Sequence, residues 1–159
     1  MKKIFILIGV FAVGIISTFL FVYVVFQTPA PCDTGRTAFL RTPQQTLTVA
    51  VASTPQQQAR GLGECKRLTQ NTGMYFPFSV ASPQTFWMKD MIIPIDIVWI
   101  SQGKVVGVLP HVPFFPPGTG DSLLPLYRSP QNVDAVLEIG AGTADSYGLT
   151  NGSPVQLLK

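Results

Sequence analysis

The segment TFWMKDMIIPIDIVWI, residues 85–100, decides the fold class of this chain. In an extended strand, successive side chains point to opposite faces. Over residues 95–100 both faces are apolar, with Asp96 as the one exception. Such a pattern is typical of a strand inside a sheet that is covered on both sides. We therefore predict that residues 95–100 form a central strand, and that Pro94 separates it from the segment before it.

Asp96 is the residue of this strand that needs an explanation. A carboxylate taken out of water is costly unless a charge or hydrogen bonds compensate it. The candidate partners are Lys89, Arg60 and backbone amides near Pro94. Because the chain has to turn between residues 90 and 94, we expect Lys89 and Asp96 to face each other.

Two interpretations of this pair stay open. In the first, Lys89 and Asp96 form a buried ion pair that braces the corner before the central strand. In the second, they line a polar pocket that is walled by aromatic side chains and by residues 110–132. The candidate ligand-binding residues are Arg60, Trp87, Lys89, Asp90, Asp96, Tyr127, Ser129 and Glu138.

Glu138 poses the same choice, since it lies between apolar neighbours in VLEI, residues 136–139. We expect it to pair with Arg60 or Arg128, or to belong to the pocket. Ser129 has no evident base in its own motif, and a serine without one is a poor nucleophile. No GxSxG, HExxH or Walker pattern is present, so no catalytic residue can be assigned.

The segments before the central strand predict two strands and one helix. TLTVAVAST predicts a strand over about 46–52, and GMYFPFSV a strand over 73–80 that is broken at a proline. Between them, residues 53–61 predict a short helix. Ser53 or Thr54 can cap it, Pro55 suits its first turn and Gly61 can end it.

The segments after the central strand predict a hairpin, a loop and two more strands. ISQGKVVGVL, residues 100–109, is typical of a hairpin that turns at Gly103. Residues 110–132 hold six prolines, so we expect a long surface loop, with His111 exposed. Strands are expected at 133–139 and 155–158, with one helical turn between them that is capped by Thr143 and ended by Gly148. The pattern predicts a mainly β, sandwich- or barrel-like single domain with one or two short helices.

The apolar excess of the chain lies at its N-terminus. Residues 4–26 carry no charge and would span ~34 Å as a helix, which exceeds the ~30 Å hydrocarbon core of a bilayer. Lys2 and Lys3 favour an N-terminus inside the cell. We predict a transmembrane signal anchor over 1–27 with its cytoplasmic lysines, a linker over 28–44 and an extracytoplasmic β domain over 45–159. The alternative is a secreted protein whose signal peptide is cleaved, although signal peptides usually have shorter apolar regions.

Charge and cysteine content limit the partners and cofactors. The formal charge is +3, and two of those positives are Lys2 and Lys3. No basic stripe is present, so we expect no nucleic-acid partner. Cys32 and Cys65 are candidates for a disulfide if the domain lies in an oxidising compartment, and two free thiols are the alternative. Two cysteines and one histidine at scattered spacing match no metal pattern, and we expect neither a metal nor a cofactor.

Several segments in this order resemble the bacterial and archaeal domain-of-unknown-function 192 family, over about residues 45–159. They are RGL at 60–62, GMYFPF at 73–78, FWMKD at 86–90, IPIDIVWI at 93–100, GKVV at 103–106, YRS at 127–129, VLEI at 136–139, and AGT with YGLTNG between 141 and 152. The resemblance implies an all-β fold with small helices, a frequent secreted or membrane-anchored location, and no established activity.

The chain departs from the family pattern at several places. Gly63 replaces the usual Met after RGL, and Cys65 replaces an Arg. Asp90 stands where Asn is usual, and Gly152-Ser153 where the family has GD. If the missing Arg contacts a ligand in relatives, Lys66 or Arg67 would have to replace it.

Three hypotheses of function follow. The first is a membrane-anchored binding module for an envelope ligand, a glycan or a peptide, because buried charge and aromatic residues coincide without a nucleophile and its base. The second is a structural or interaction domain for another envelope protein. The third is a hydrolase-like enzyme in which Asp96 or Glu138 acts as a general base. The lipid bilayer is the partner expected for residues 4–26.

Overall fold

The computed structural model describes Cys32 and residues 36–158, which belong to one compact unit, Pro31–Lys159. The predicted anchor at residues 4–26 lies outside the described residues. None of the helices in the described part is both long enough and apolar enough to cross a membrane.

The described part is mainly β, with one short α-helix and two 3-10 turns, as the sequence predicts. The elements are β1 (Thr37–Arg41), β2 (Thr46–Val51), α2 (Pro55–Arg60), β3 (Thr72–Ser82), β4 (Thr85–Phe86), β5 (Ile95–Ser101), β6 (Lys104–Val112), η1 (Asp121–Leu123), β7 (Tyr127–Arg128), β8 (Val133–Gly140), η2 (Asp145–Tyr147) and β9 (Gln156–Leu158).

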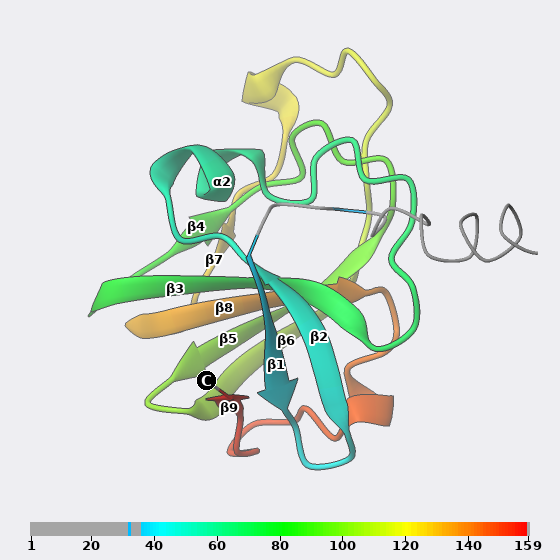
Figure 1. The fold of residues 1–159 in the computed structure, drawn as a ribbon. Coiled ribbons are helices and arrows are strands. Elements are labelled where there is room, and N and C mark those ends of the chain that lie inside the picture. The colour runs from blue at the N-terminus through cyan, green and yellow to red at the C-terminus, as the bar shows by residue number, and fades with distance from the viewer. Residues whose placement is uncertain (1–31, 33–35, 159) are drawn as a thin grey trace, which may run out of the picture. The chain divides into compact units, whose positions relative to one another are not determined.

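Seven of the strands form one mixed sheet, in the order β6-β5-β8-β3-β2-β1-β9 (Figure 1). The β2–β3 pair is parallel and the other pairs are antiparallel. The predicted central strand is β5, which lies between β6 and β8 and is buried along almost its whole length. β4 and β7 form a separate two-stranded ribbon on the same side of the sheet as α2 (Figure 1).

The sheet partly closes on itself. Lys104 at the start of β6 forms an isolated antiparallel bridge with Pro154, just before β9. Next to it, the Val105 amide donates to Ser153 O at 2.9 Å, and the Val105 carbonyl accepts from the Gly152 amide at 2.8 Å. Because β6 and β9 are the two ends of the strand order, these bonds join the edges of the sheet, as in a barrel.

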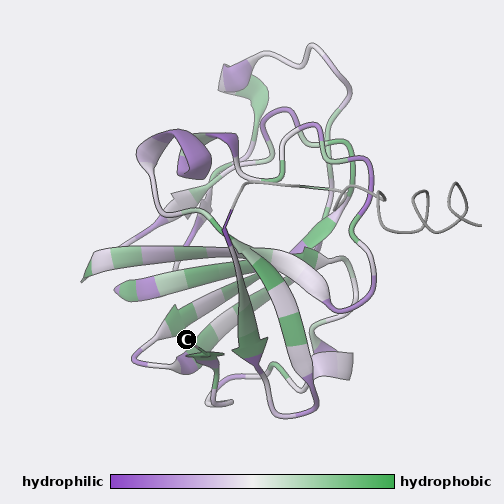
Figure 2. Cartoon of the chain, in the orientation of Figure 1, coloured by the Kyte–Doolittle hydropathy of each residue, from purple (hydrophilic) through white to green (hydrophobic). Residues whose placement is uncertain are grey.

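Each face of the sheet carries its own apolar cluster. The first cluster lies on the inner side of the curved sheet and includes Leu47, Val98, Leu137 and Tyr147. The second lies on the side of α2 and the β4–β7 ribbon, where it includes members of loops as well as strands, namely Leu62, Met74, Phe76, Met88, Met91, Ile97, Trp99 and Val136. The strands are accordingly largely apolar, whereas α2 is mostly polar (Figure 2). Because both faces of the sheet are covered by apolar clusters, the side chains on both sides of β5 are apolar.

Helix α2 forms as its sequence predicts. The Thr54 side chain accepts from the Gln57 amide, and the Gln57 side chain accepts from the Thr54 amide, which makes a capping box. Pro55 occupies the first turn, and Gly61 ends the helix with φ 52°. Gln58 Nε2 donates to Ala52 O and Pro77 O, and so holds the helix on the sheet.

Some predicted boundaries are wrong. Thr37–Arg41 lies inside the predicted linker of 28–44 but forms β1, with Leu40 fully buried. β3 runs through Pro77 without ending, although its register with β8 shifts after that residue. β6 takes the first residues of the predicted loop 110–132, and the edge position tolerates Pro110. The η2 turn has no side-chain cap, and Gly148 ends it in the left-handed region, as predicted.

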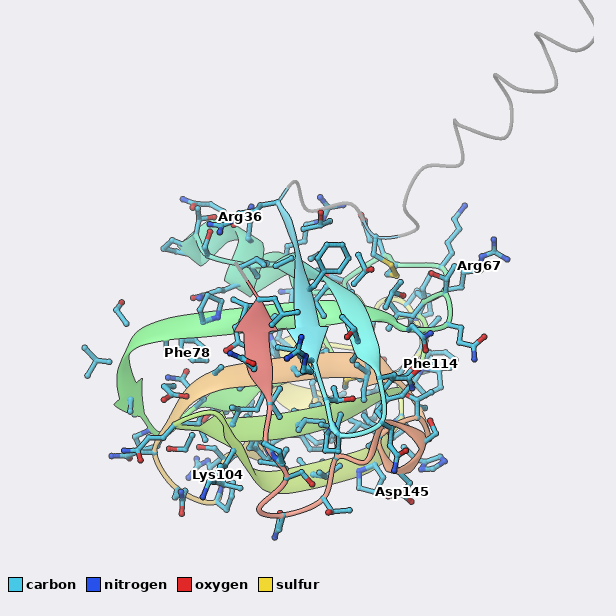
Figure 3. All side chains as sticks on the ribbon, turned by 60° about the horizontal axis from the view of Figure 1, so that its bottom comes forward. Arg36, Arg67, Phe78, Lys104, Phe114 and Asp145 are labelled. Carbon is cyan, nitrogen blue, oxygen red and sulfur yellow. A yellow bond between two sulfur atoms is a disulfide. The ribbon has the colours of Figure 1, made fainter. Side chains whose placement is uncertain are left out.

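A disulfide joins Cys32 and Cys65, with their Cα atoms 5.4 Å apart. Figure 3 shows the sulfur pair close to Arg67, whose carbonyl lies 3.4 Å from both Sγ atoms. The bond ties the segment before β1 to the loop that follows α2.

Candidate functional site

Glu138 is the centre of the candidate site. It lies on β8, opposite Met74 of β3 and Ile97 of β5, on the face of the sheet below α2. Only 4% of its surface is exposed, and its Oε2 is buried without a hydrogen-bond partner among the residues that the structure describes. A Cβ placed on Gly61, at the end of α2, would lie 3.8 Å from this oxygen. An acid in this position is rare, because buried polar groups are almost always satisfied.

Burial controls the protonation of Glu138. Loss of hydration disfavours the carboxylate and raises the pKa of Glu138 from 4.5 to about 8. The side chain is therefore mostly a neutral acid at pH 7, with one O–H donor and a free acceptor. A neutral carboxyl without partners can receive a hydrogen-bonding group at a modest desolvation cost.

A small pocket of about 30 Å³ opens onto Glu138. A single water needs ~10–15 Å³ on a comparable scale, so the pocket has room for about two non-hydrogen atoms of a ligand. Three of the residues predicted from the sequence line it with Glu138, namely Arg60, Trp87 and Lys89. The rest of the lining is Gln58, Ala59, Gly61, Leu62, Phe76, Phe86 and Met91.

An aromatic row fixes the wall of this pocket. Phe86 packs edge-on against Phe76, with ring centroids 5.0 Å apart, and against Trp99 at 5.6 Å. Edge-to-face packing of this kind is favourable beyond simple burial. It holds the chain just before Trp87 in a defined position, while 39% of the Trp87 side chain stays exposed at the rim.

Lys89 joins this rim to the proline-rich loop. Its Nζ donates to Asp121 Oδ2 at 2.5 Å and lies 5.2 Å from the centroid of the Trp87 ring. The hydrogen bond to Asp121 is the main cause of the raised pKa of Lys89. The predicted Lys89–Asp96 pair is therefore wrong, because Lys89 turns outward to a partner that lies 32 residues later in the chain.

Asp96 is fully buried, and backbone amides satisfy it. Its Oδ1 accepts from the His111 and Gly142 amides, both at 2.8 Å, and its Oδ2 accepts from the Ala144 amide at 2.9 Å. Backbone amides were among the predicted partners, but near Pro94 rather than on β6 and the turn after β8. The sequence feature that could have indicated the Gly142 and Ala144 donors is the Gly-rich segment GAGTA, residues 140–144. Asp96 therefore joins the end of β6 to the turn after β8, which is a structural role. It does not line the Glu138 pocket.

The remaining predicted residues lie around the site rather than in it. Asp90 has a positive φ of 57° and lines a separate cavity of about 200 Å³ between residues 88–92 and the proline-rich loop. Tyr127 lies opposite Phe86 in the ribbon, and partial burial raises the pKa of its phenol. Ser129 accepts from the Gln84 amide and donates to Gln131 O, so its hydroxyl serves the local fold.

The predicted ion pair of Glu138 with Arg60 or Arg128 is also wrong. Within the described part of the chain, Lys89–Asp121 is the only ion pair shorter than 4.0 Å. Arg128 lines a different cavity, to which Glu138 does not contribute. In residues 36–158 with Cys32, no three His, Cys, Asp or Glu side chains lie close enough together to hold a metal ion.

A larger groove that sequence reasoning missed lies along β6. Its volume is about 490 Å³. One wall is residues 106–111 of β6 and the other is the segment from Gly142 to Asn151. Asp96, Trp99, Arg128 and Pro130 complete the lining, and Trp99 belongs to the second apolar cluster.

Comparison with known proteins places the chain in a family. The sequence model of DUF192, described as "Uncharacterized ACR", matches residues 38–157, which is most of the chain. The chain belongs to the DUF192 family. The match begins at β1 and ends in β9, so DUF192 corresponds to the complete sheet. No curated protein matches the sequence.

Two solved structures have the same fold. A putative transcription regulator from Sinorhizobium meliloti 1021 is 26% identical, with a TM-score of 0.66, and the match covers 76% of this chain and 92% of that one. A protein of unknown function from Novosphingobium aromaticivorans DSM 12444 is 24% identical, with a TM-score of 0.64, and the match covers 76% of this chain and 83% of that one. Neither likeness assigns a reaction to the DUF192 domain.

Proposed function

We propose that the domain is a binding module that holds a hydroxyl-bearing ligand, a glycan of the cell envelope, at the Glu138 pocket. The observation that carries the proposal is the buried Oε2 of Glu138, which has no partner in the described part of the chain but lies beside a pocket. A hydroxymethyl group has about the size that the pocket admits. Its O–H can donate to Glu138 while its oxygen accepts from the protonated carboxyl.

The rim of the pocket favours a sugar over a cationic ligand. Arg60 lines the pocket without an ion pair to the described residues, and its positive charge would repel an amine that approached the carboxyl. Trp87 is partly exposed at the rim and offers an aromatic surface on which a pyranose ring can stack. Arg60 also remains available for an acidic group of the ligand, since it makes no ion pair with the described residues.

A catalytic role at this pocket is the second candidate, because a carboxyl with a pKa of about 8 can act as a general acid. Glycoside hydrolysis usually needs two carboxyl groups on either side of the scissile bond. Glu138 is the only acidic side chain among the residues that line the pocket. The lining therefore supports binding more strongly than hydrolysis.

The location of the domain is part of the proposal. The uncharged run at residues 4–26 supports a membrane anchor, and the Cys32–Cys65 bond supports an oxidising compartment. A domain that is tethered at the outer face of the inner membrane would meet envelope glycans.

Isothermal titration calorimetry of the full chain in detergent with soluble glycan fragments tests the proposal. We expect saturable binding that Glu138→Ala and Trp87→Ala each weaken about tenfold, as the loss of a hydrogen bond or a stacking surface predicts. Asp90→Ala, which lies outside the pocket lining, is the matched control and should bind as the parent does. Equal affinities in all four proteins would remove the Glu138 pocket as the site.

The same titration distinguishes an amine ligand from a hydroxyl ligand. Repeating it in buffers of different ionisation enthalpy measures the protons released on binding. A hydroxyl ligand leaves Glu138 protonated and releases none, whereas an ammonium ligand would expel the proton of Glu138. Proton release close to one per ligand would contradict a glycan at this site.

A further inference from the structure

The groove along β6 exposes the edge of a strand rather than one of its faces. Residues 106, 107, 108, 109, 110 and 111 all line it. Successive residues of a strand point to opposite faces, so a cavity that touches every one of them faces the backbone edge. β6 is also the last strand of the sheet order at this end.

Strand pairing on this edge begins and then stops. At Lys104 and Val105 the edge pairs with residues 152–154 in antiparallel fashion. At the other end, Asp96 accepts from both the His111 and Gly142 amides and holds the two walls together. Between these ends, no backbone hydrogen bond to the outer edge of residues 106–110 is present in the described part of the chain. Five residues of strand span ~17 Å.

The sides of the groove suit an extended chain with alternating side chains. Trp99 and Pro130 border it on one side, and Ala144 and Leu149 on the other. Trp99 belongs to the second apolar cluster, whereas Ala144 and Leu149 belong to the first. Side chains of an added strand would therefore meet an apolar surface in both directions.

The two sides of the groove also differ in charge. Arg128 is exposed on the side of Pro130, and it makes no ion pair with the residues that the structure describes. Asp145, the first residue of η2, is exposed on the opposite wall, and Figure 3 shows it at the periphery of the domain. An extended peptide that places an acidic residue toward Arg128 and a basic or polar one toward Asp145 is complementary to this arrangement.

We propose that the outer edge of β6 is a second binding site, which takes an extended peptide segment by β-strand addition. Main-chain groups of the peptide pair with the edge at residues 106–110, as residues 152–154 pair with Lys104 and Val105. Apolar side chains enter the two sides of the groove, and an acidic side chain binds Arg128. The site is separate from the Glu138 pocket, whose lining shares no residue with the groove.

Selection of a random peptide library on the full chain in detergent tests the proposal. We expect enriched sequences with alternating apolar residues and an acidic residue at a fixed position. Selection on Arg128→Glu should replace that acidic residue with a basic one. Arg60→Glu, which makes the same charge change at the Glu138 pocket, is the matched control and should select the parent motif.

Backbone pairing has its own readout. In a selected peptide, N-methylation of every second amide should weaken binding about tenfold or more, because only alternate amides of an added strand face the sheet. Methylation of the intervening amides should have a much smaller effect. Hydrogen exchange should slow when the peptide binds at those amides of residues 106–109 that face the groove, since Pro110 has no N–H.

Three results would overturn the proposal. No peptide is enriched over an unrelated protein; or binding is insensitive to the position of N-methylation; or Arg60→Glu weakens binding as much as Arg128→Glu. Light scattering tests for a different occupant. Concentration-dependent dimers, with protected amides at residues 106–109 in the absence of peptide, would assign the edge to a second copy of the chain and contradict the peptide site.

Discussion

At the scale of single residues, two buried acids in one domain have opposite environments. Asp96 and Glu138 lie on neighbouring strands, and both are almost inaccessible to water. Three backbone amides donate to Asp96, so its negative charge is compensated by hydrogen bonds. Glu138 has an unpartnered oxygen and a pKa of about 8, so burial keeps it neutral. This difference supports a structural role for Asp96, and it is the reason for proposing Glu138 as the ligand-binding residue.

The raised pKa of Glu138 predicts a pH dependence of stability. The folded state retains a proton that the unfolded state releases above pH 4.5, so the free energy of unfolding falls as the pH rises from about 4.5 to about 8. The contribution is fully present below pH 4.5 and is lost through pH 8. The slope approaches ~1.4 kcal/mol per pH unit in this window. In Glu138→Gln this contribution is absent.

Urea unfolding at a series of pH values measures this slope. Both tryptophans of the chain, Trp87 and Trp99, lie in the described domain and report its unfolding by fluorescence. Glu64→Gln, a change at an exposed glutamate, should keep the slope of the parent. If Glu138→Gln and the parent lose stability in parallel between pH 5 and pH 8, Glu138 is not the group that retains the proton.

At the scale of elements, sequence reasoning succeeded where the signal is local. The capping residues of α2 and the turn at Gln102-Gly103 act within a few residues of the chain, and both form as predicted. β5 was identified because both of its faces are apolar. β1 was missed because prolines precede it and because its pairing with β9 joins residues more than a hundred positions apart. The partners of Lys89, Asp96 and Glu138 likewise depend on such distant contacts, which the pattern of one segment does not encode.

Asp96 links two elements, and its removal should loosen both. The carboxylate joins the end of β6, at His111, to the turn after β8, at Gly142 and Ala144. In Asp96→Ala, water can reach the amides of the exposed His111 and Gly142, but the Ala144 amide is left buried. We expect a loss of ~3 kcal/mol in the free energy of unfolding, since hydrogen bonds to charged groups contribute ~1.5–3 kcal/mol each.

Urea unfolding compares Asp96→Ala with Asp145→Ala. Asp145 is an exposed acid of the same region and should change stability by no more than ~0.5 kcal/mol. Hydrogen exchange adds a local measure, because the amides of residues 111, 142 and 144 should exchange faster in Asp96→Ala alone. A stability loss as small as that of Asp145→Ala would show that the three hydrogen bonds do not clasp these elements.

At the scale of the whole molecule, two long-range links complete the domain. The bonds between Val105 and residues 152–153 join the two edges of the sheet. The Cys32–Cys65 disulfide joins the segment before β1 to the loop after α2, across 33 positions. The edge closure leaves β6 open only beyond Val105, and the disulfide fixes residue 32 beside the second apolar cluster. Both proposed binding sites thus lie on a sheet whose two edges are hydrogen-bonded to each other and whose N-terminal segment is fixed by the disulfide.

The disulfide carries a prediction about stability and about location. Closing a loop of this length stabilises a fold by ~3–4 kcal/mol in the chain-entropy picture, so Cys32→Ser with Cys65→Ser should lose about this amount in urea unfolding. Disulfides of this kind are typical of oxidising compartments, so the proposed location outside the cytoplasm can be tested through the bond. Cells trapped in acid and labelled with a polymer-tagged maleimide should show no mass shift until a reductant is added, and then two additions, because the chain has two cysteines. Two reactive thiols in unreduced cells would place the domain in a reducing compartment and remove the envelope as the source of its ligand.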